Sequence, residues 1–220
     1  MKKIILLCIV TLSGPVRHLL LLLLLAGGVE GSLCFSQQDT GRYIHKGLLR
    51  AQATICPGVL LKENATMIYI HGCLEYYVAD NVSVRGDSYY DVMAGNTKKE
   101  TGPLGYNHST FAGVAYHFKT KNHFDPYFSF EPGISITKGN DYSGIICDPG
   151  PCLSQGETSA NPLLSTAVGF NLYFEKWFHL FGEAKYVSGK YLSDAYAPKS
   201  LNELRFSFGL GFNLNLLKKK

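Results

Sequence analysis

Long apolar runs are missing from most of this chain. Beyond position 36 no apolar stretch reaches the roughly 18 residues of a transmembrane-helix candidate. No long segment carries the 3.6-residue period of an amphipathic helix either. Charged residues make up only 17% of the sequence and form no basic patch, which argues against nucleic acid as a partner. These absences exclude a helical membrane protein and favour a β protein.

The N-terminus has the features of a targeting segment. Lys2 and Lys3 precede two short apolar runs, 4–12 and 19–26, and residues 13–15 break the apolar pattern between them. Neither run is long enough to cross a bilayer. The pattern predicts a signal peptide over residues 1–36, and therefore an exported protein. Residues 37–46 would follow as an N-terminal segment, and residues 217–220 would form a basic tail.

The last strand candidate, residues 203–216, alternates over its whole length. One face is entirely apolar: Leu204, Phe206, Phe208, Leu210, Phe212, Leu214 and Leu216. The other face holds charges, glycines and amides: Glu203, Arg205, Ser207, Gly209, Gly211, Asn213 and Asn215. A period of two over this length indicates a long strand with one fully apolar face. This distribution suits a barrel that presents its apolar side to lipid and keeps polar groups inside.

Similar alternation recurs along the chain and predicts further strands. The expected ranges are 48–58, 67–78, 82–92, 109–118, 125–137, 163–175, 177–189 and 203–216. The expected short turns are 79–81, 119–123 and 175–176, and the longer loops are 58–66, 93–108, 138–162 and 190–201. Alternation of short turns and long loops is typical of outer-membrane barrels. Because Pro132 falls inside a predicted paired strand, a β-bulge is expected there.

A water-soluble barrel of lipocalin type is the alternative, with the apolar rows turned inward. The interior of an eight-stranded barrel is only just wide enough for side chains. The apolar rows carry many Phe, Leu, Ile and Tyr residues, which are too bulky to share that space. The opposite rows carry glycines that fit a crowded interior: Gly113, Gly133, Gly169, Gly209 and Gly211. The pattern therefore favours an all-β fold, an eight-stranded antiparallel up-and-down transmembrane β-barrel over residues 47–216.

In strand number, loop asymmetry and leader, the chain resembles the small outer-membrane barrels of OmpA/OmpX type. The resemblance implies a location in the outer membrane of a Gram-negative bacterium. It also implies two partners, outer-membrane lipid and the barrel-assembly machinery. Those families end on an aromatic residue, whereas this chain ends with Leu216-Leu217 and three lysines.

Charged residues on the predicted inward rows are candidates for a salt-bridge network in the lumen. They are Glu75, Arg85, Asp87, Glu131, Glu183, Lys185, Glu203 and Arg205. Charges in so narrow a space must be paired or solvated. A turn centred on Asp80 would place Glu75 opposite Arg85. A second hairpin would place Glu183 opposite Arg205 and Lys185 opposite Glu203. The favoured interpretation is a structural plug, and the alternative is an ion path or gate.

No motif in the sequence specifies catalysis, a cofactor or a metal site. His71, His117 and His179 fall on inward rows, but no Ser/His/acid spacing indicates a nucleophile. The expected function is therefore structural, or adhesive through an extracellular ligand bound by loops 93–108 and 138–162. Two alternatives remain open: transport of a small hydrophobic molecule, and a lipid-modifying barrel enzyme.

Four cysteines follow the leader. Cys147 and Cys152 flank Asp148-Pro149-Gly150-Pro151, a turn-forming sequence in a predicted extracellular loop. An exported protein meets an oxidising environment, so a Cys147–Cys152 disulfide is predicted. Cys56 and Cys73 lie on inward rows of neighbouring strands and are expected to be free.

Overall fold

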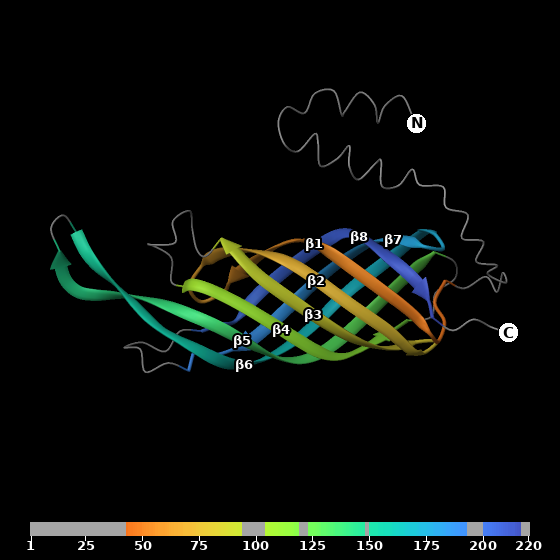
Figure 1. The fold of residues 1–220 in the computed structure, drawn as a ribbon, viewed down its shortest axis with the longest axis horizontal. Helices are drawn as coiled ribbons and strands as arrows, with labels where there is room; N and C mark the ends of the chain where they lie inside the picture. Colours follow the sequence, from red (N-terminus) through yellow and green to blue (C-terminus); the bar gives the residue numbers. More distant parts are fainter. Residues whose placement is uncertain (1–42, 94–103, 119–122, 148–149, 193–199, 217–220) are drawn as a thin grey trace, which may run out of the picture. The chain divides into compact units, whose positions relative to one another are not determined.

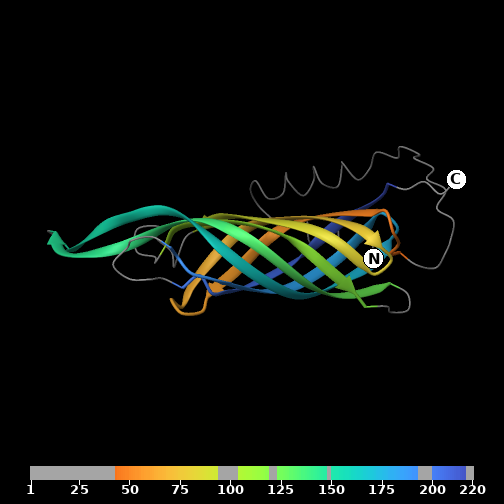
Figure 2. The same cartoon turned by 90° about the horizontal axis from the view of Figure 1, so that it is seen from below.

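The strands of this protein close into a single antiparallel barrel. The computed structural model describes residues 43–93, 104–118, 123–147, 150–192 and 200–216, with the side chains of residues 93 and 141–156 excepted. Each strand pairs with its neighbours in sequence, and β1 pairs with β8 (Figures 1 and 2). The strands are β1 Leu48–Leu60, β2 Ala65–Ala79, β3 Val82–Met93, β4 Leu104–His117, β5 Phe124–Cys147, β6 Gly150–Glu175, β7 Phe178–Gly189 and β8 Glu203–Asn215. The predicted fold class is confirmed.

The strand faces follow the alternation of the sequence. Large apolar side chains project outward and remain exposed, as with Ile55 at 68% and Phe208 at 62%. Charged and hydroxyl side chains alternate with them and are buried in the lumen. A barrel that exposes apolar groups and buries charges is adapted to lipid outside and polar contacts inside. Within the described residues no helix has the length and apolar character needed to cross a membrane.

Exposed aromatic rings gather near the barrel end that carries residues 80–81, Phe118, His123 and residues 176–177, here called the short-turn end. Trp177 stacks with Phe212 at 6.1 Å between ring centroids, and Phe124 lies 5.8 Å from Phe170. Near the opposite end, here called the hairpin end, His108 stacks between Tyr90 and Tyr106. Aromatic girdles at both interfaces flank the apolar band of membrane barrels.

The predicted loop over residues 138–162 is wrong, because β5 and β6 run through it. Their pairing continues from Lys138↔Thr158 to Cys147↔Gly150, with register shifts on the way. Figure 1 shows the two strands continuing together well past the rest of the barrel. β4 likewise begins at Leu104, inside the predicted loop 93–108. Outside lipid, neither face of a strand needs an apolar row, so backbone pairing persists where the alternation of the sequence fades.

The predicted bulge at Pro132 is also wrong. Pro132 pairs with Leu164 of β6 in an unbroken register. On the other side, the β4 ladder pairs Phe111 with Gly133 and Val114 with Phe130, and no pair is formed at residues 112–113. The register is the same on both sides of this gap. Because proline has no N–H to donate, the ladder is interrupted without an inserted residue.

The β1–β8 closure has a longer interruption. Residues 48–52 pair with 211–215, and residues 58–60 pair with 203–205, but no backbone pairs join the segments between them. Pro57 lies in the interrupted part of β1. There the hydroxyl of Thr54 donates to the carbonyl oxygen of Phe208 at 2.6 Å. A side-chain hydrogen bond thus replaces part of the ladder where the barrel closes.

Candidate functional site: the charged lumen

Many charged side chains are buried in the barrel interior. All eight residues of the predicted lumen network are at most 6% exposed. Further ionisable residues are buried among them, and they include Arg50, His71, His117 and Asp125. His71 and His117 were already expected on inward rows, and the same alternation places Arg50 and Asp125 there.

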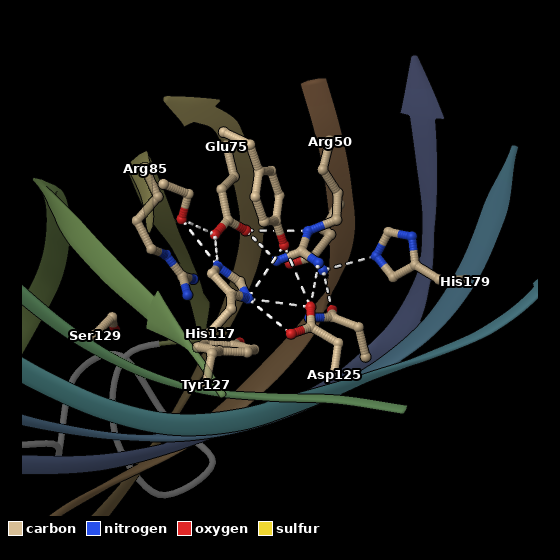
Figure 3. Close-up of polar contacts among 12 residues, drawn as sticks. Arg50, Glu75, Arg85, His117, Asp125, Tyr127, Ser129 and His179 are labelled. Carbon is tan, nitrogen blue, oxygen red and sulfur yellow. Dashed lines mark hydrogen bonds and ion pairs between the residues drawn. The ribbon is translucent and has the colours of Figure 1, made fainter. Parts of the chain in front are cut away.

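At the short-turn end, two bases and two carboxylates alternate in a closed ring of four side chains (Figure 3), here called the charge ring. Arg50 pairs with Glu75, and its Nη1 lies 3.3 Å from Oδ2 of Asp125. His117 closes the other side, with Nε2 at 2.9 Å from Glu75 and Nδ1 at 2.9 Å from Asp125. Arg50 and His117 each contact both carboxylates. The members come from β1, β2, β4 and β5, so the ring connects strands across the lumen.

Hydroxyl and amide groups complete the coordination of the charge ring. Tyr173 accepts a hydrogen bond of 2.9 Å from Arg50, and Asn171 donates one of 3.0 Å to Asp125. Ser83 donates to Glu75 and lies 3.0 Å from Nε2 of His117. Buried charges are tolerated when the remaining donors and acceptors are satisfied in this way.

Ser83, His117 and Asp125 have the order of contacts seen in a Ser/His/acid triad. However, Ser83 is 0% exposed, and its hydroxyl is directed to the Glu75 carboxylate. A nucleophile must instead reach a substrate from the position beside its base. The arrangement holds charges together across the lumen and does not present a nucleophile.

The middle of the lumen contains a second cluster around Arg85 and Lys185. Arg85 contacts Asp87 at 3.0 Å, Glu131 at 3.3 Å and Glu183 at 2.7 Å. Lys185 contacts Asp87 at 2.7 Å and Glu131 at 2.9 Å. Two cations thus bridge three carboxylates, and His71 adds a contact of 2.8 Å to Asp87.

Toward the hairpin end the lumen becomes more aromatic and apolar, with buried polar side chains such as Asn107 and Thr137 among the apolar ones. Arg205 pairs with Glu203 at 2.8 Å, and its guanidinium lies 4.4 Å from the ring centroids of both Tyr69 and Tyr89. Cation–π contacts of this kind stabilise a desolvated guanidinium. Both rings belong to one buried apolar cluster: Cys56, Leu60, Ala65, Met67, Tyr69, Tyr89, Leu104, Phe111, Leu163, Val187, Tyr191 and Leu201. Packed side chains therefore fill this part of the barrel.

The predicted pairing was correct for one hairpin and wrong for the other. Glu75 does face Arg85 across the strands, although its carboxylate forms ion pairs with Arg50 and His117 instead. Glu183 faces Ser207, and Lys185 faces Arg205, so the predicted Glu183–Arg205 and Lys185–Glu203 pairs are not formed. The register differs by two residues from the predicted one. A shift of two leaves every side chain on the same face, so alternation cannot detect it.

The structure describes the side chains of two of the four cysteines that follow the predicted signal peptide. Cys56 and Cys73 are free and buried, as expected. The side chains of Cys147 and Cys152 lie outside the described residues, so their disulfide stays a prediction. In the backbone, Cys147 pairs with Gly150, two positions before Cys152 on the same strand. Among the described residues no group of three or more His, Cys, Asp or Glu could hold a metal ion.

Comparisons with known proteins agree with this architecture. No family model and no curated protein sequence matches the chain. Among solved structures, outer membrane protein OprG from Pseudomonas aeruginosa superposes with a TM-score of 0.55 at 10% identity, covering 79% of this chain and 99% of that one. Neisserial surface protein A (NspA) superposes with a TM-score of 0.50 at 14% identity, covering 76% and 96%. At these identities the likeness is one of fold, the fold of the small outer-membrane β-barrels.

Proposed function

We propose that this protein is a non-catalytic outer-membrane β-barrel of a Gram-negative envelope, whose sealed barrel anchors a binding hairpin at the cell surface. The exposed apolar wall, the aromatic girdles and the fold support the location. The short-turn end would face the periplasm and the hairpin end the exterior, because outer-membrane barrels have short periplasmic turns and longer extracellular connections.

The extension of β5 and β6 beyond their neighbours carries the proposal of a binding role. The last β4 pair is Leu104↔Gly139, and the last β7 pair is Leu163↔Gly189. Pairing between β5 and β6 continues to Cys147↔Gly150. Within the described residues, neither β4 nor β7 pairs with this outer part of the hairpin. Elements that project from a rigid barrel are where such scaffolds carry recognition.

A lumen filled by its own side chains supports an anchor over a conduit. Ion-pair clusters occupy the middle and the short-turn end, and apolar side chains occupy the hairpin end. An eight-stranded barrel has little further internal space. We propose that the network of Glu75, Arg85, Asp87, Glu131, Glu183, Lys185, Glu203 and Arg205 acts as a structural plug.

Shortening the hairpin tests the binding role. Because Tyr142 pairs with Leu153, replacing residues 143–152 with Asn-Gly rejoins the two strands through a two-residue turn. Cells that display this variant should lose adhesion to immobilised extracellular proteins and to other cells, while the barrel remains heat-modifiable on gels. A matched control replaces the short turn 80–81 with Asn-Gly and should keep adhesion. Equal adhesion by both variants would refute a role for the hairpin.

Transport of a small hydrophobic molecule is the second candidate, and the β1–β8 interruption favours it. The break between residues 53–57 and 206–210 lies beside Cys56, a member of the apolar cluster. A wall with fewer hydrogen bonds is easier to open sideways into lipid. Cysteines at Ile55 and Phe208, two exposed positions that the flanking register places opposite each other, would tether this seam. Loss of uptake of a hydrophobic dye on oxidation, with recovery on reduction, would support transport, and unchanged uptake would refute it.

A further inference from the structure

We propose that the proton on His117 is a structural component of the barrel: as an imidazolium, His117 supplies the second cation of the charge ring and makes the closure of the short-turn end pH-dependent. The inference goes beyond the proposed function, because it holds whatever the hairpin binds. It rests on the contacts of the two ring nitrogens and on the balance of charge around them.

Both imidazole nitrogens of His117 face carboxylate oxygens. Nε2 lies 2.9 Å from Oε1 of Glu75, and Nδ1 lies 2.9 Å from Oδ1 of Asp125. An ionised carboxylate only accepts hydrogen bonds, so each nitrogen must donate. A neutral imidazole carries one N–H and would turn a lone pair toward one of the two carboxylates. Only the imidazolium satisfies both contacts with both carboxylates ionised.

The charge balance of the ring requires the same proton. Arg50 is the only other cation in contact with Glu75 and Asp125 among the described residues. With His117 charged, two cations meet two anions. With His117 neutral, a single guanidinium serves two carboxylates that are at most 1% exposed, and buried charge without a partner is strongly destabilising.

The other groups around His117 cannot replace this charge. From β2, the Tyr77 hydroxyl lies 3.2 Å from Nδ1, and from β3, the Ser83 hydroxyl lies 3.0 Å from Nε2. From β5, the Tyr127 ring lies 5.5 Å from the imidazole. From β6, Asn171 and Tyr173 hydrogen-bond to Asp125. All of these are neutral polar groups at physiological pH.

His179 provides an internal contrast in the same lumen. It is also buried, but its Nε2 lies 2.9 Å from the Gln52 amide nitrogen, and it contacts no carboxylate of the described residues. An amide N–H only donates, so Nε2 accepts and carries no proton. His179 is therefore expected to be neutral with its proton on Nδ1. The two histidines differ in charge although they share the barrel interior.

Nitrogen NMR of ¹⁵N-histidine-labelled protein in lipid bilayers tests the proposal at pH 7.5. The His117 signals, assigned by their loss in His117→Gln, should show two protonated nitrogens. The His179 signals, assigned by their loss in His179→Gln, should show one protonated and one bare nitrogen. A bare nitrogen on His117 would overturn the proposal.

A mutant cycle provides a second readout. His117→Gln should lower the folding equilibrium constant at pH 6 at least about a hundredfold, because one carboxylate loses its cation. Adding Glu75→Gln restores one cation to one anion and should recover a large part of the loss. Equal effects of His117→Gln in the presence and absence of Glu75→Gln would overturn the proposal. If His117→Gln does not fold, folding of the double variant alone supports the proposal. Failure of both variants to fold overturns it.

The pH dependence has a defined sign. The imidazolium stabilises the ring only while its proton is bound, so its contribution is lost as the pH rises past the point where the folded protein releases it. The difference in unfolding midpoint between wild type and His117→Gln should therefore shrink between pH 6 and pH 10. The corresponding difference for His179→Gln should not shrink; it should grow slightly above pH 6 and then level off, because a histidine that is neutral in the folded protein costs stability only where the unfolded chain binds its proton. A difference for His117→Gln that stays constant from pH 6 to pH 10 would overturn the proposal.

Discussion

Replacing Arg85 by methionine should destabilise the barrel by leaving one particular carboxylate without a cation. Arg85 contacts Asp87, Glu131 and Glu183. When it is removed, Asp87 and Glu131 keep Lys185 at 2.7 and 2.9 Å, respectively. Glu183 keeps only the Tyr127 hydroxyl at 2.7 Å and a distant Lys185 at 3.9 Å. Glu183 is therefore the carboxylate that loses its charge partner.

The expected cost is about 3–5 kcal/mol, the range for removing one partner of a buried ion pair. Methionine matches the length of the arginine stem, so the lost charge dominates over lost packing. Adding Glu183→Gln should recover about 1–3 kcal/mol through the coupling of neighbouring groups. Adding Glu131→Gln should recover less, since Glu131 also accepts a hydrogen bond of 2.6 Å from Ser129.

Urea unfolding in lipid vesicles, followed by tryptophan fluorescence, measures these differences. Trp177 is the single tryptophan of the chain and lies at the short-turn end. Lys62→Met is the matched control, because it removes a charge from an exposed position in the β1–β2 turn and should change stability by less than about 0.5 kcal/mol. A cost below about 1 kcal/mol for Arg85→Met, or equal rescue by Glu183→Gln and Glu131→Gln, would refute the reasoning.

Three further predictions follow from the same contacts. Glu183→Ala and Arg205→Ala should be additive within about 0.5 kcal/mol, because no contact joins them, and a larger coupling in unfolding experiments would contradict the observed β7–β8 register. Gly169→Val should cost about 1–3 kcal/mol in the same assay, since an added Cβ would lie 2.5 Å from the Tyr127 hydroxyl oxygen, whereas Gly72→Val on the open outer face should be nearly neutral. Mass spectrometry of non-reduced protein purified from membranes should show a Cys147–Cys152 disulfide, and free thiols at both positions would disprove it.

The sequence by itself determined the strands and their faces. Strict alternation from Leu204 to Leu216 shows which side of β8 meets lipid, and the same rule places Glu75, Arg85 and Lys185 in the lumen. This works because the side-chain period of a strand is two, and because lipid outside and a narrow polar lumen inside sort residues strongly between the two faces. By the same argument Arg50, His117 and Asp125 could have been added to the predicted salt-bridge network of the lumen.

Only the tertiary structure decided which of these side chains meet. Closure of the barrel brings Arg50 of β1 against Asp125 of β5, two residues on strands that are not neighbours. The β7–β8 register, set across the long connection 190–202, pairs Lys185 with Arg205 and directs Arg205 to Glu203 on its own strand. The outer part of the β5–β6 hairpin also escaped prediction. Contacts across a lumen depend on strand stagger and closure, and a shift of two residues leaves every face of the sequence pattern unchanged.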